Sequence, residues 1–220
     1  MNSKDKETHI SRTMERFSKY GVDSRTLGWP KNNTWQRFKV LSEVGNLNNK
    51  TILDLGCGYA DLYNWLGENG WQGKYIGYDI VPKYVEVARS RYPAVEICEI
   101  DILEKDISEK YDYVMACGVM NAKVLEENND LYIEKMLSKM LQLARVAVSC
   151  DFLSPYVDFQ GPWAYHPNMD VIIGIIRRLS KRFAIRHDYM PYEFTAYIYK
   201  NDLVDKELNI FEEKLIKCES

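Results

Sequence analysis

Short apolar runs alternate with amphipathic, helix-like segments along the middle of this chain, and this alternation constrains the fold more than any other feature. The runs end in glycine, acidic or small residues, as buried strands do where they lead into loops. The segments between them carry apolar residues at helical spacing, most clearly over 131–144. Five such alternations predict an α/β fold with a doubly wound, mostly parallel sheet and helices on both faces. The five predicted strands cover 51–55, 75–78, 95–100, 111–117 and 146–151.

The end of the chain breaks this alternation. Two strand-like runs, 183–189 and 195–200, are separated by a short turn that contains Pro191 and by no helix. Consecutive strands without a crossover pair antiparallel. We therefore expect a seven-stranded sheet whose last strand is antiparallel to its neighbours.

Three segments follow from this pattern: an N-terminal helical extension or lid over 1–46, a core domain over 47–200 and a C-terminal helix over 201–220. Within the extension, apolar residues recur at three-residue spacing over 35–44, which predicts an amphipathic helix. Residues 1–20 are highly charged, and we expect a frayed helix or a tail there. The charged C-terminal helix is expected over 203–217.

Composition narrows the class of protein. The chain has 220 residues, a net charge of −3 and a pI of about 5.7, whereas nucleic-acid-binding proteins usually carry a basic surface. The five cysteines form no C-x-x-C pair and the three histidines are scattered, so we expect no metal site. No run is long and apolar enough for a membrane span, and the polar N-terminus lacks a secretory signal. We expect a cytoplasmic protein with neither a nucleic-acid nor a membrane partner.

The most informative stretch follows the first predicted strand. Asp54 and Leu55 lead into Gly56 and Gly58, and a helix is expected from Asp61. A strand, a glycine-rich turn and a helix start form a nucleotide-type site, because glycine lets the backbone approach a ligand closely. On their own, the two glycines would also fit a tight turn without a ligand.

Acidic residues at the ends of the next two strands strengthen the ligand interpretation. Asp79 closes the second strand, where a carboxylate can accept hydrogen bonds from both ribose hydroxyls. Asp101 and Ile102 follow the third strand, where an acid and an apolar residue can meet an adenine amino group and ring. Any one of these acids alone is more often a solvated loop carboxylate. Their occurrence at successive strand ends favours a shared site.

With these residues the chain resembles the class I S-adenosylmethionine (SAM) dependent methyltransferases, whose first motif reads D/E-x-G-x-G-x-G. Asp54, Gly56 and Gly58 match that motif, and Ala60 replaces its last glycine. Alanine is small, so we expect a modest local change in the loop. The resemblance covers about residues 47–200, including the antiparallel last strand, and implies SAM as the cofactor.

The resemblance also implies roles for individual residues. Asp79 would bind the ribose, Asp101 and Ile102 the adenine, and the backbone of the glycine loop the methionine end. The full set of expected cofactor residues is Asp54, Gly56, Cys57, Gly58, Asp79, Ile80, Asp101, Ile102 and Cys117.

A nicotinamide dinucleotide is the rival cofactor. Its fingerprint, G-x-G-x-x-G, would need glycine at position 61, where this chain has Asp61. A carboxylate there would repel a pyrophosphate at the helix start. SAM carries a sulfonium cation and no phosphate, so the acidic loop argues against a dehydrogenase.

Substrate contacts are expected from segments that leave the carboxyl ends of later strands, at 151–166 and 187–193. Both are rich in aromatic residues, which would also suit loops that only pack. Many methyltransferases of the family that this chain resembles use an N-terminal extension as a lid. By that resemblance, residues of the N-terminal segment are also expected to contact the substrate. The expected substrate-binding residues are Trp29, Arg37, Tyr156, Trp163, Tyr165, His166 and Tyr189.

His187 is the expected catalytic base. It stands at the end of the sixth predicted strand, and a histidine near its ordinary pKa can accept a proton from a hydroxyl or amine. Asp188 is adjacent and so points to the opposite face of a strand, which makes it a poor orienting partner. His166 and Tyr189 are alternative bases.

These features predict methylation of an oxygen or nitrogen on a small molecule, with a sugar or natural-product intermediate as candidate acceptors. One alternative is a SAM-fold binding or scaffold protein whose crevice Trp163 or Tyr165 fills. Another is a protein or RNA methyltransferase, although the N/D-P-P-Y motif common among enzymes that methylate amide or exocyclic nitrogens is replaced here by 116–121. Transfer of another SAM-derived group, such as aminopropyl, and a homodimer are left open.

Overall fold

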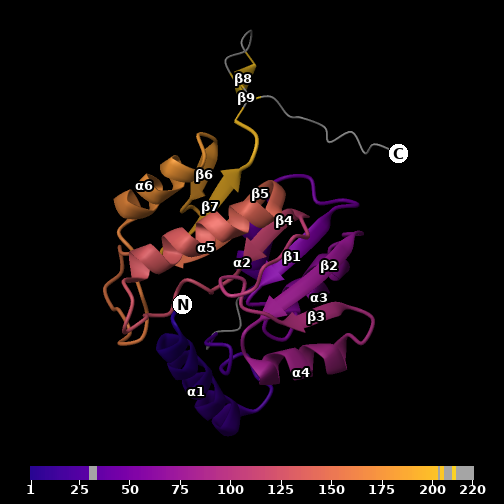
Figure 1. Ribbon diagram of the computed structural model, residues 1–220, viewed down its shortest axis with the longest axis vertical. Coiled ribbons are helices and arrows are strands. Elements are labelled where there is room, and N and C mark those ends of the chain that lie inside the picture. Colours follow the sequence, from indigo (N-terminus) through magenta and orange to yellow (C-terminus); the bar gives the residue numbers. More distant parts are fainter. Residues whose placement is uncertain (30–33, 203, 206–209, 212–220) are drawn as a thin grey trace.

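A seven-stranded sheet forms the centre of the chain in a computed structural model that describes residues 1–29, 34–202, 204–205 and 210–211. The sheet is flanked by helices on both faces (Figure 1). In chain order, the elements are α1 (Ser3–Tyr20), α2 (Thr34–Ser42), β1 (Thr51–Leu55), α3 (Asp61–Glu68), β2 (Lys74–Asp79), α4 (Pro82–Arg91), β3 (Glu96–Glu99), β4 (Tyr111–Ala116), α5 (Asn129–Leu143), β5 (Ala144–Leu153), α6 (Met169–Leu179), β6 (Phe183–Arg186), β7 (Glu193–Tyr199), β8 (Val204–Asp205) and β9 (Ile210–Phe211).

The strand order is β3-β2-β1-β4-β5-β7-β6. β1 pairs in parallel with both β2 and β4, and β7 is antiparallel to both of its neighbours, β5 and β6. This confirms the predicted fold class. The chain winds outward from β1 to β3 and then returns to place β4 on the other side of β1. Such a reversal opens a crevice at the carboxyl ends of β1 and β4, where ligands bind in this class of sheet.

Side chains from alternating strand positions build a separate apolar core on each face of the sheet. Leu53 of β1 and Val114 of β4 belong to the core under α5 and α6, whereas Ile52 and Met115 belong to the core under α2, α3 and α4. All four of these side chains are fully buried. Burial of each such side chain contributes about 1.5–3 kcal/mol to stability. The two cores hold the central strands rigidly, and with them the loops that follow.

Asparagine side chains begin three of the helices. Asn2, Asn128 and Asn168 accept hydrogen bonds from backbone N–H groups in the first turns of α1, α5 and α6. α4 begins instead at Pro82, which suits a first turn because its missing N–H would have no helical partner there.

α1 is a complete helix that lies beyond the carboxyl ends of the parallel strands (Figure 1). The expectation of a frayed helix or tail over residues 1–20 is therefore wrong. Ile10 and Phe17 pack against a small apolar cluster around Tyr59, Val81 and Tyr84. These contacts turn one side of α1 toward the sheet.

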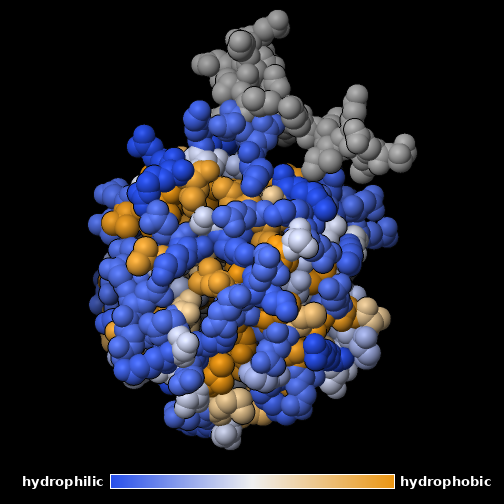
Figure 2. Space-filling view, viewed as in Figure 1, coloured by the Kyte–Doolittle hydropathy of each residue, from blue (hydrophilic) through white to orange (hydrophobic). Residues whose placement is uncertain are grey.

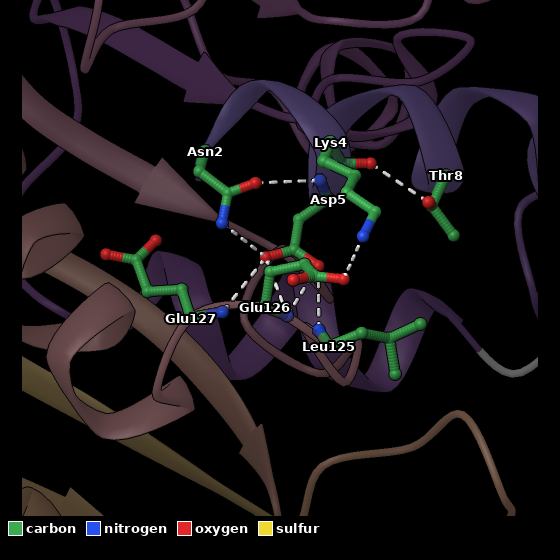
Figure 3. Close-up of polar contacts among 7 residues, drawn as sticks. All are labelled: Asn2, Lys4, Asp5, Thr8, Leu125, Glu126 and Glu127. Carbon is green, nitrogen blue, oxygen red and sulfur yellow. Dashed lines mark hydrogen bonds and ion pairs between the residues drawn. The ribbon is translucent and has the colours of Figure 1, made fainter.

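Asp5 fixes the beginning of α1 to the loop before α5 (Figure 3). Its side chain is only 4% exposed, and its carboxylate accepts backbone N–H bonds from Leu125 at 2.7 Å, from Glu126 at 3.1 and 3.2 Å and from Glu127 at 3.2 Å. Asn2 adds a side-chain N–H at 3.0 Å. Hydrogen bonds to a charged group are about twice as strong as neutral ones, so this contact is a strong anchor.

The expected C-terminal helix over 203–217 falls mostly outside the described residues. Its described part forms β8 and β9, with Val204 opposite Phe211 and Asp205 opposite Ile210 in an antiparallel ladder. The helix is therefore wrong for these residues, whose backbone pairs between strands.

The face of the molecule seen in Figure 2 is mainly polar. In the view of Figure 2, hydrophilic side chains cover most of it, and apolar ones form separate patches between them. Within the described ranges, none of the helices combines the length and the apolar character that a membrane span requires.

Replacing Asp5 with Asn should loosen α1. The amide has one acceptor oxygen where the carboxylate has two, and its N–H₂ faces backbone donors, so we expect a loss of about 1–3 kcal/mol in the local stability of the helix. Hydrogen exchange of the α1 amides should accelerate accordingly. The exposed Glu7 on the same helix offers a control, since Glu7→Gln should leave exchange unchanged. Equal exchange rates in both variants would contradict the anchoring role.

Candidate active site

A cavity lies at the carboxyl ends of β1, β2, β3 and β4, and α1 with the following turn (21–29) forms its roof. The structure brings all nine expected cofactor residues to this one cavity. Of the roof residues that line the cavity, the sequence prediction included only Trp29. It did not include His9, Thr13, Arg16 and Leu27, nor Met1, which precedes α1 and also lines the cavity.

The loop after β1 has the left-handed backbone that its glycines permit. Gly56 and Gly58 have φ angles of +66° and +54°, and Ala60 has +59°. A Cβ atom on Gly56 would lie 2.4 Å from the Cγ2 atom of Val119, so no larger residue fits there without a shift. Ala60, which replaces the family's last glycine, adopts the left-handed conformation despite its methyl group, at a cost of about 1–2 kcal/mol.

Asp79 joins this loop to the end of β2. Its Oδ2 atom accepts the N–H of Gly58 at 2.9 Å, and its Oδ1 atom accepts the N–H of Val81 at 2.8 Å. Burial raises the pKa of Asp79 to about 6, and the two N–H groups limit the rise. Each oxygen keeps a further lone pair that can accept a hydroxyl proton from a ligand.

Asp54 brings a second buried carboxyl group to the cavity. Its Oδ2 atom accepts a hydrogen bond from the hydroxyl of Tyr75 at 2.6 Å. Burial raises the pKa of Asp54 to about 7, and the negative charge of Asp79 adds to the rise, against the opposing effect of the Tyr75 hydrogen bond. The charge of a cationic ligand would oppose this rise in pKa, because it favours the ionised carboxylate.

The loop after β3 closes the other end of the cavity. Asp101 accepts the N–H of Leu103 at 2.9 Å and lies 3.3 Å from the Nζ atom of Lys6 on α1. Ile102 is buried beside it, which gives this end an apolar wall. The acid and the apolar residue thus lie together, as the sequence predicted.

The polar side chains that α1 turns toward the cavity are His9, Thr13 and Arg16. Their spacing of four and three residues places them on one face of a helix, and this signal was present in the sequence. Burial lowers the pKa of His9 to about 4, and the charges of Arg16 and Arg12 lower it further, so His9 is neutral near pH 7.

At the β4 side of the cavity, Trp29 separates the cavity from a group of buried charges. The guanidinium carbon of Arg37 lies 4.2 Å from the centroid of the Trp29 ring. A Cβ atom on Gly118 would lie 2.7 Å from the same ring, so the indole is pressed against the loop after β4. Arg37 in turn donates from Nε to Glu193 at 2.6 Å, within a buried ion pair.

Asp151 lies in the same buried group, and we refer to Arg37, Asp151 and Glu193 as the Arg37 cluster. The Oδ1 atom of Asp151 accepts the N–H of Gly118 at 2.6 Å. Burial raises the pKa of Asp151, and it raises that of Glu193 to about 7, while Arg37 opposes both shifts. Two carboxyl groups that share one guanidinium can hold a proton near neutral pH.

Three of the seven expected substrate residues meet at this cluster. Besides Trp29 and Arg37, these include Tyr189, whose hydroxyl pairs with Thr195 at 2.8 Å and whose pKa is raised by burial and by the charge of Asp151. The other four lie elsewhere and do not line the cavity: Tyr156 is 70% exposed, Trp163 is 48% exposed beside Arg12, Tyr165 bonds to Asp130, and His166 bonds to the carbonyl of Ser154 at 2.7 Å.

His187 does not line the cavity either. It follows β6 at the edge of the sheet, and its exposed ring lies 6.2 Å from the ring of Tyr156 and 6.3 Å from that of Phe194. β5 and β7 lie between β6 and β4. At the ordinary spacing between strands, β6 and β4 are therefore about 14 Å apart. The structure therefore does not bring the expected base to the carboxyl end of β4.

The sequence and fold match known methyltransferases. A family model described as a methyltransferase domain matches residues 46–185. A putative methyltransferase of Mycobacterium tuberculosis is 30% identical over 155 residues, which covers 68% of this chain and 93% of that protein. A putative methyltransferase of Invertebrate iridescent virus 6 is 27% identical over 124 residues, which covers 54% of this chain and 47% of the viral protein.

Solved structures share the fold. The magnesium protoporphyrin IX methyltransferase of Synechocystis with bound SAM aligns with a TM-score of 0.63 and 19% identity, over 90% of this chain and 99% of that one. A SAM-dependent methyltransferase of Clostridium acetobutylicum aligns with a TM-score of 0.58 and 14% identity, also over 90% and 99%. By its family match and its curated relatives, this chain belongs to the methyltransferase domain family and is a SAM-dependent methyltransferase of class I.

Proposed function

We propose that this methyltransferase acts on an oxygen or nitrogen of a small-molecule acceptor. The observation that carries the proposal is the roof of the cavity, since α1 and the turn 21–29 cover the carboxyl ends of the strands and Trp29 lies against the loop after β4. A small molecule can reach a site covered in this way through a limited movement of the turn. A folded macromolecule would need an open surface. A sugar or natural-product intermediate is a candidate acceptor.

The residues that line the cavity fit SAM. Gly56 and Gly58 present backbone to the cavity, and Asp79 keeps a lone pair on each oxygen for the ribose hydroxyls. Asp101 and the buried Ile102 suit the adenine. When bound, SAM supplies an electrophilic methyl group on a sulfonium cation, and the acidic lining of the cavity favours a cation.

We propose the Arg37 cluster as the group that takes the acceptor's proton. It lies behind Trp29 at the β4 end of the cavity and holds two carboxyl groups for one guanidinium. When one carboxyl group is ionised, the cluster can accept the proton that a hydroxyl or amine releases on methylation. An acceptor that reaches it must displace the Trp29 ring, which covers Arg37. His187 remains the alternative base.

A second candidate function is a SAM-fold scaffold without catalysis. In that interpretation Trp163 or Tyr165 would fill the crevice, yet neither of them lines the cavity. A protein or RNA acceptor is the remaining alternative, and the net charge of −3 disfavours a polyanionic partner. A methyl-transfer screen with isotopically labelled SAM, run in parallel on small hydroxyl compounds and amines, on tRNA and on a protein extract, separates the three. Labelling of tRNA or protein alone would overturn the small-molecule proposal.

Binding of SAM and of S-adenosylhomocysteine tests the cofactor residues directly. Asp79→Ala should make the binding free energy of both compounds less favourable by about 1–3 kcal/mol, because the ribose hydroxyls lose their acceptors. Isothermal titration gives the affinities, and Asp170→Ala, at an exposed site on α6, serves as the control. Folded wild-type protein that binds neither compound would refute the cofactor assignment.

Asp54→Asn should change how stability depends on pH. The unfolded carboxyl titrates near 3.8 and the folded one near 7, so the native state binds the extra proton and the wild-type protein loses stability as pH rises from about 4 to 7. The amide does not titrate. Urea unfolding without cofactor should therefore show the variant gaining about 2–4 kcal/mol relative to wild type between pH 4.5 and 8. Parallel pH curves for the two proteins would contradict the shifted pKa.

The base can be identified with the acceptor that the screen finds. For the Arg37 cluster, kcat/KM should rise with pH through about 7, where Glu193 loses its proton. Glu193→Gln should lower kcat by about 10²-fold or more and flatten that rise, while His187→Ala should retain wild-type turnover. If His187→Ala loses turnover and Glu193→Gln keeps its pH profile, the base is His187.

A further inference from the structure

The roof of the cavity carries a half-buried cationic side chain whose hydrogen-bonding capacity is only partly used. Arg16 lines the cavity from α1, and its Nε atom is buried without a hydrogen-bond partner among the described residues. Its Nη2 atom donates to the Oγ1 atom of Thr13 at 3.3 Å. Within the described ranges, no carboxylate forms an ion pair with it. A buried, unsatisfied donor on a charged group is costly, which suggests that a ligand completes it.

Contacts at both ends of the roof hold Arg16 over the cavity. Asp5 anchors the start of α1 to the loop 125–127. At the other end, the hydroxyl of Tyr84 donates to the carbonyl of Thr26 at 2.8 Å, and Thr26 donates to the carbonyl of Gly21 at 2.7 Å. Arg16 is therefore presented by a fixed helix and not by a mobile terminus.

The position of the guanidinium relates it to the glycine loop. A Cβ atom on Gly28 would lie 3.3 Å from the Nη1 atom of Arg16, so the guanidinium rests against the turn at that residue. The adjacent Leu27 packs against Gly58, where a Cβ atom would meet the Leu27 Cδ2 atom at 3.0 Å. The cation thus lies near the loop that is expected to hold the methionine end of the cofactor, and Asp101 and Ile102 lie at the adenine end.

We infer that Arg16 binds the carboxylate of the methionine moiety of SAM, an inference that rests on the cofactor site proposed above. Arginine presents several N–H groups in a planar fork that matches a carboxylate, and such charged pairs are the stronger class of hydrogen bond. The carboxylate is the anionic group of SAM, whereas its adenosine part is neutral. His9, the neighbouring titratable group on this face of α1, is neutral near pH 7, so Arg16 is the cation available on the cavity side of the helix.

A pair of ligands that differ by the carboxylate alone tests this assignment. S-Adenosylhomocysteine carries the carboxylate, and its decarboxylated analogue, 5′-(3-aminopropylthio)-5′-deoxyadenosine, does not. Arg16→Met should lower the affinity for S-adenosylhomocysteine by about 10- to 100-fold. It should lower the affinity for the analogue by less than about threefold. Arg16→Lys should recover part of the loss, because it restores the charge but not the fork. Isothermal titration, with competition for the weaker ligand, gives all the constants.

The controls separate this inference from the cofactor site itself. Lys19→Met removes an exposed cation from the same helix and should bind both ligands as the wild type does. If Arg16→Met lowers the affinity for both ligands equally, Arg16 acts by supporting the roof. If it lowers the affinity for neither ligand, Arg16 contacts neither of them. Both results overturn the inference while leaving the site intact. Failure of the wild type to bind S-adenosylhomocysteine would instead refute the cofactor site.

Discussion

The hydrogen bonds that Asp79 accepts from Gly58 and Val81 are the interactions on which the cavity depends. They tie the loop after β1 to the end of β2 and allow a carboxylate to stay buried, since each oxygen replaces part of its lost hydration with a backbone N–H. The loop can present its N–H in this direction because Gly58 adopts a left-handed conformation. The glycines therefore shape the floor of the cavity and also direct the donors that hold the acid in place.

The roof depends on a second buried carboxylate. Asp5 accepts backbone N–H groups from residues 125–127, as Asp79 does from the glycine loop. Both acids act through backbone donors, so neither needs a basic partner side chain. Arg16, the cation on the cavity side of α1, has no ion-pair partner among the described residues, and the acids of the floor line the same cavity.

The sequence predicted the sheet and the floor of the cavity because both depend on local patterns. Strand ends carry glycine and acidic residues, and parallel strands bring those ends together. The position of α1 could not be predicted in the same way, since Asp5 and Leu125 are 120 residues apart. The position of His187 relative to the cavity could not be predicted for a similar reason. The residue does follow a strand end, but β7 inserts between β5 and β6 and carries that end to the edge of the sheet. Within 203–217, where the sequence predicted a charged helix, the described residues 204–205 and 210–211 pair as strands.

The turn 21–29 connects the two halves of the site. Leu27 packs on Gly58 at the floor, Thr26 bonds to Tyr84 at the start of α4, and Trp29 lies on Gly118 and covers Arg37. Three residues of one short segment therefore contact the glycine loop, α4 and the Arg37 cluster. Because the segment is continuous with α1, the turn cannot move far at Trp29 without disturbing its packing at Leu27. The fold thus makes access to the buried charges behind Trp29 depend on the same segment that covers the glycine loop.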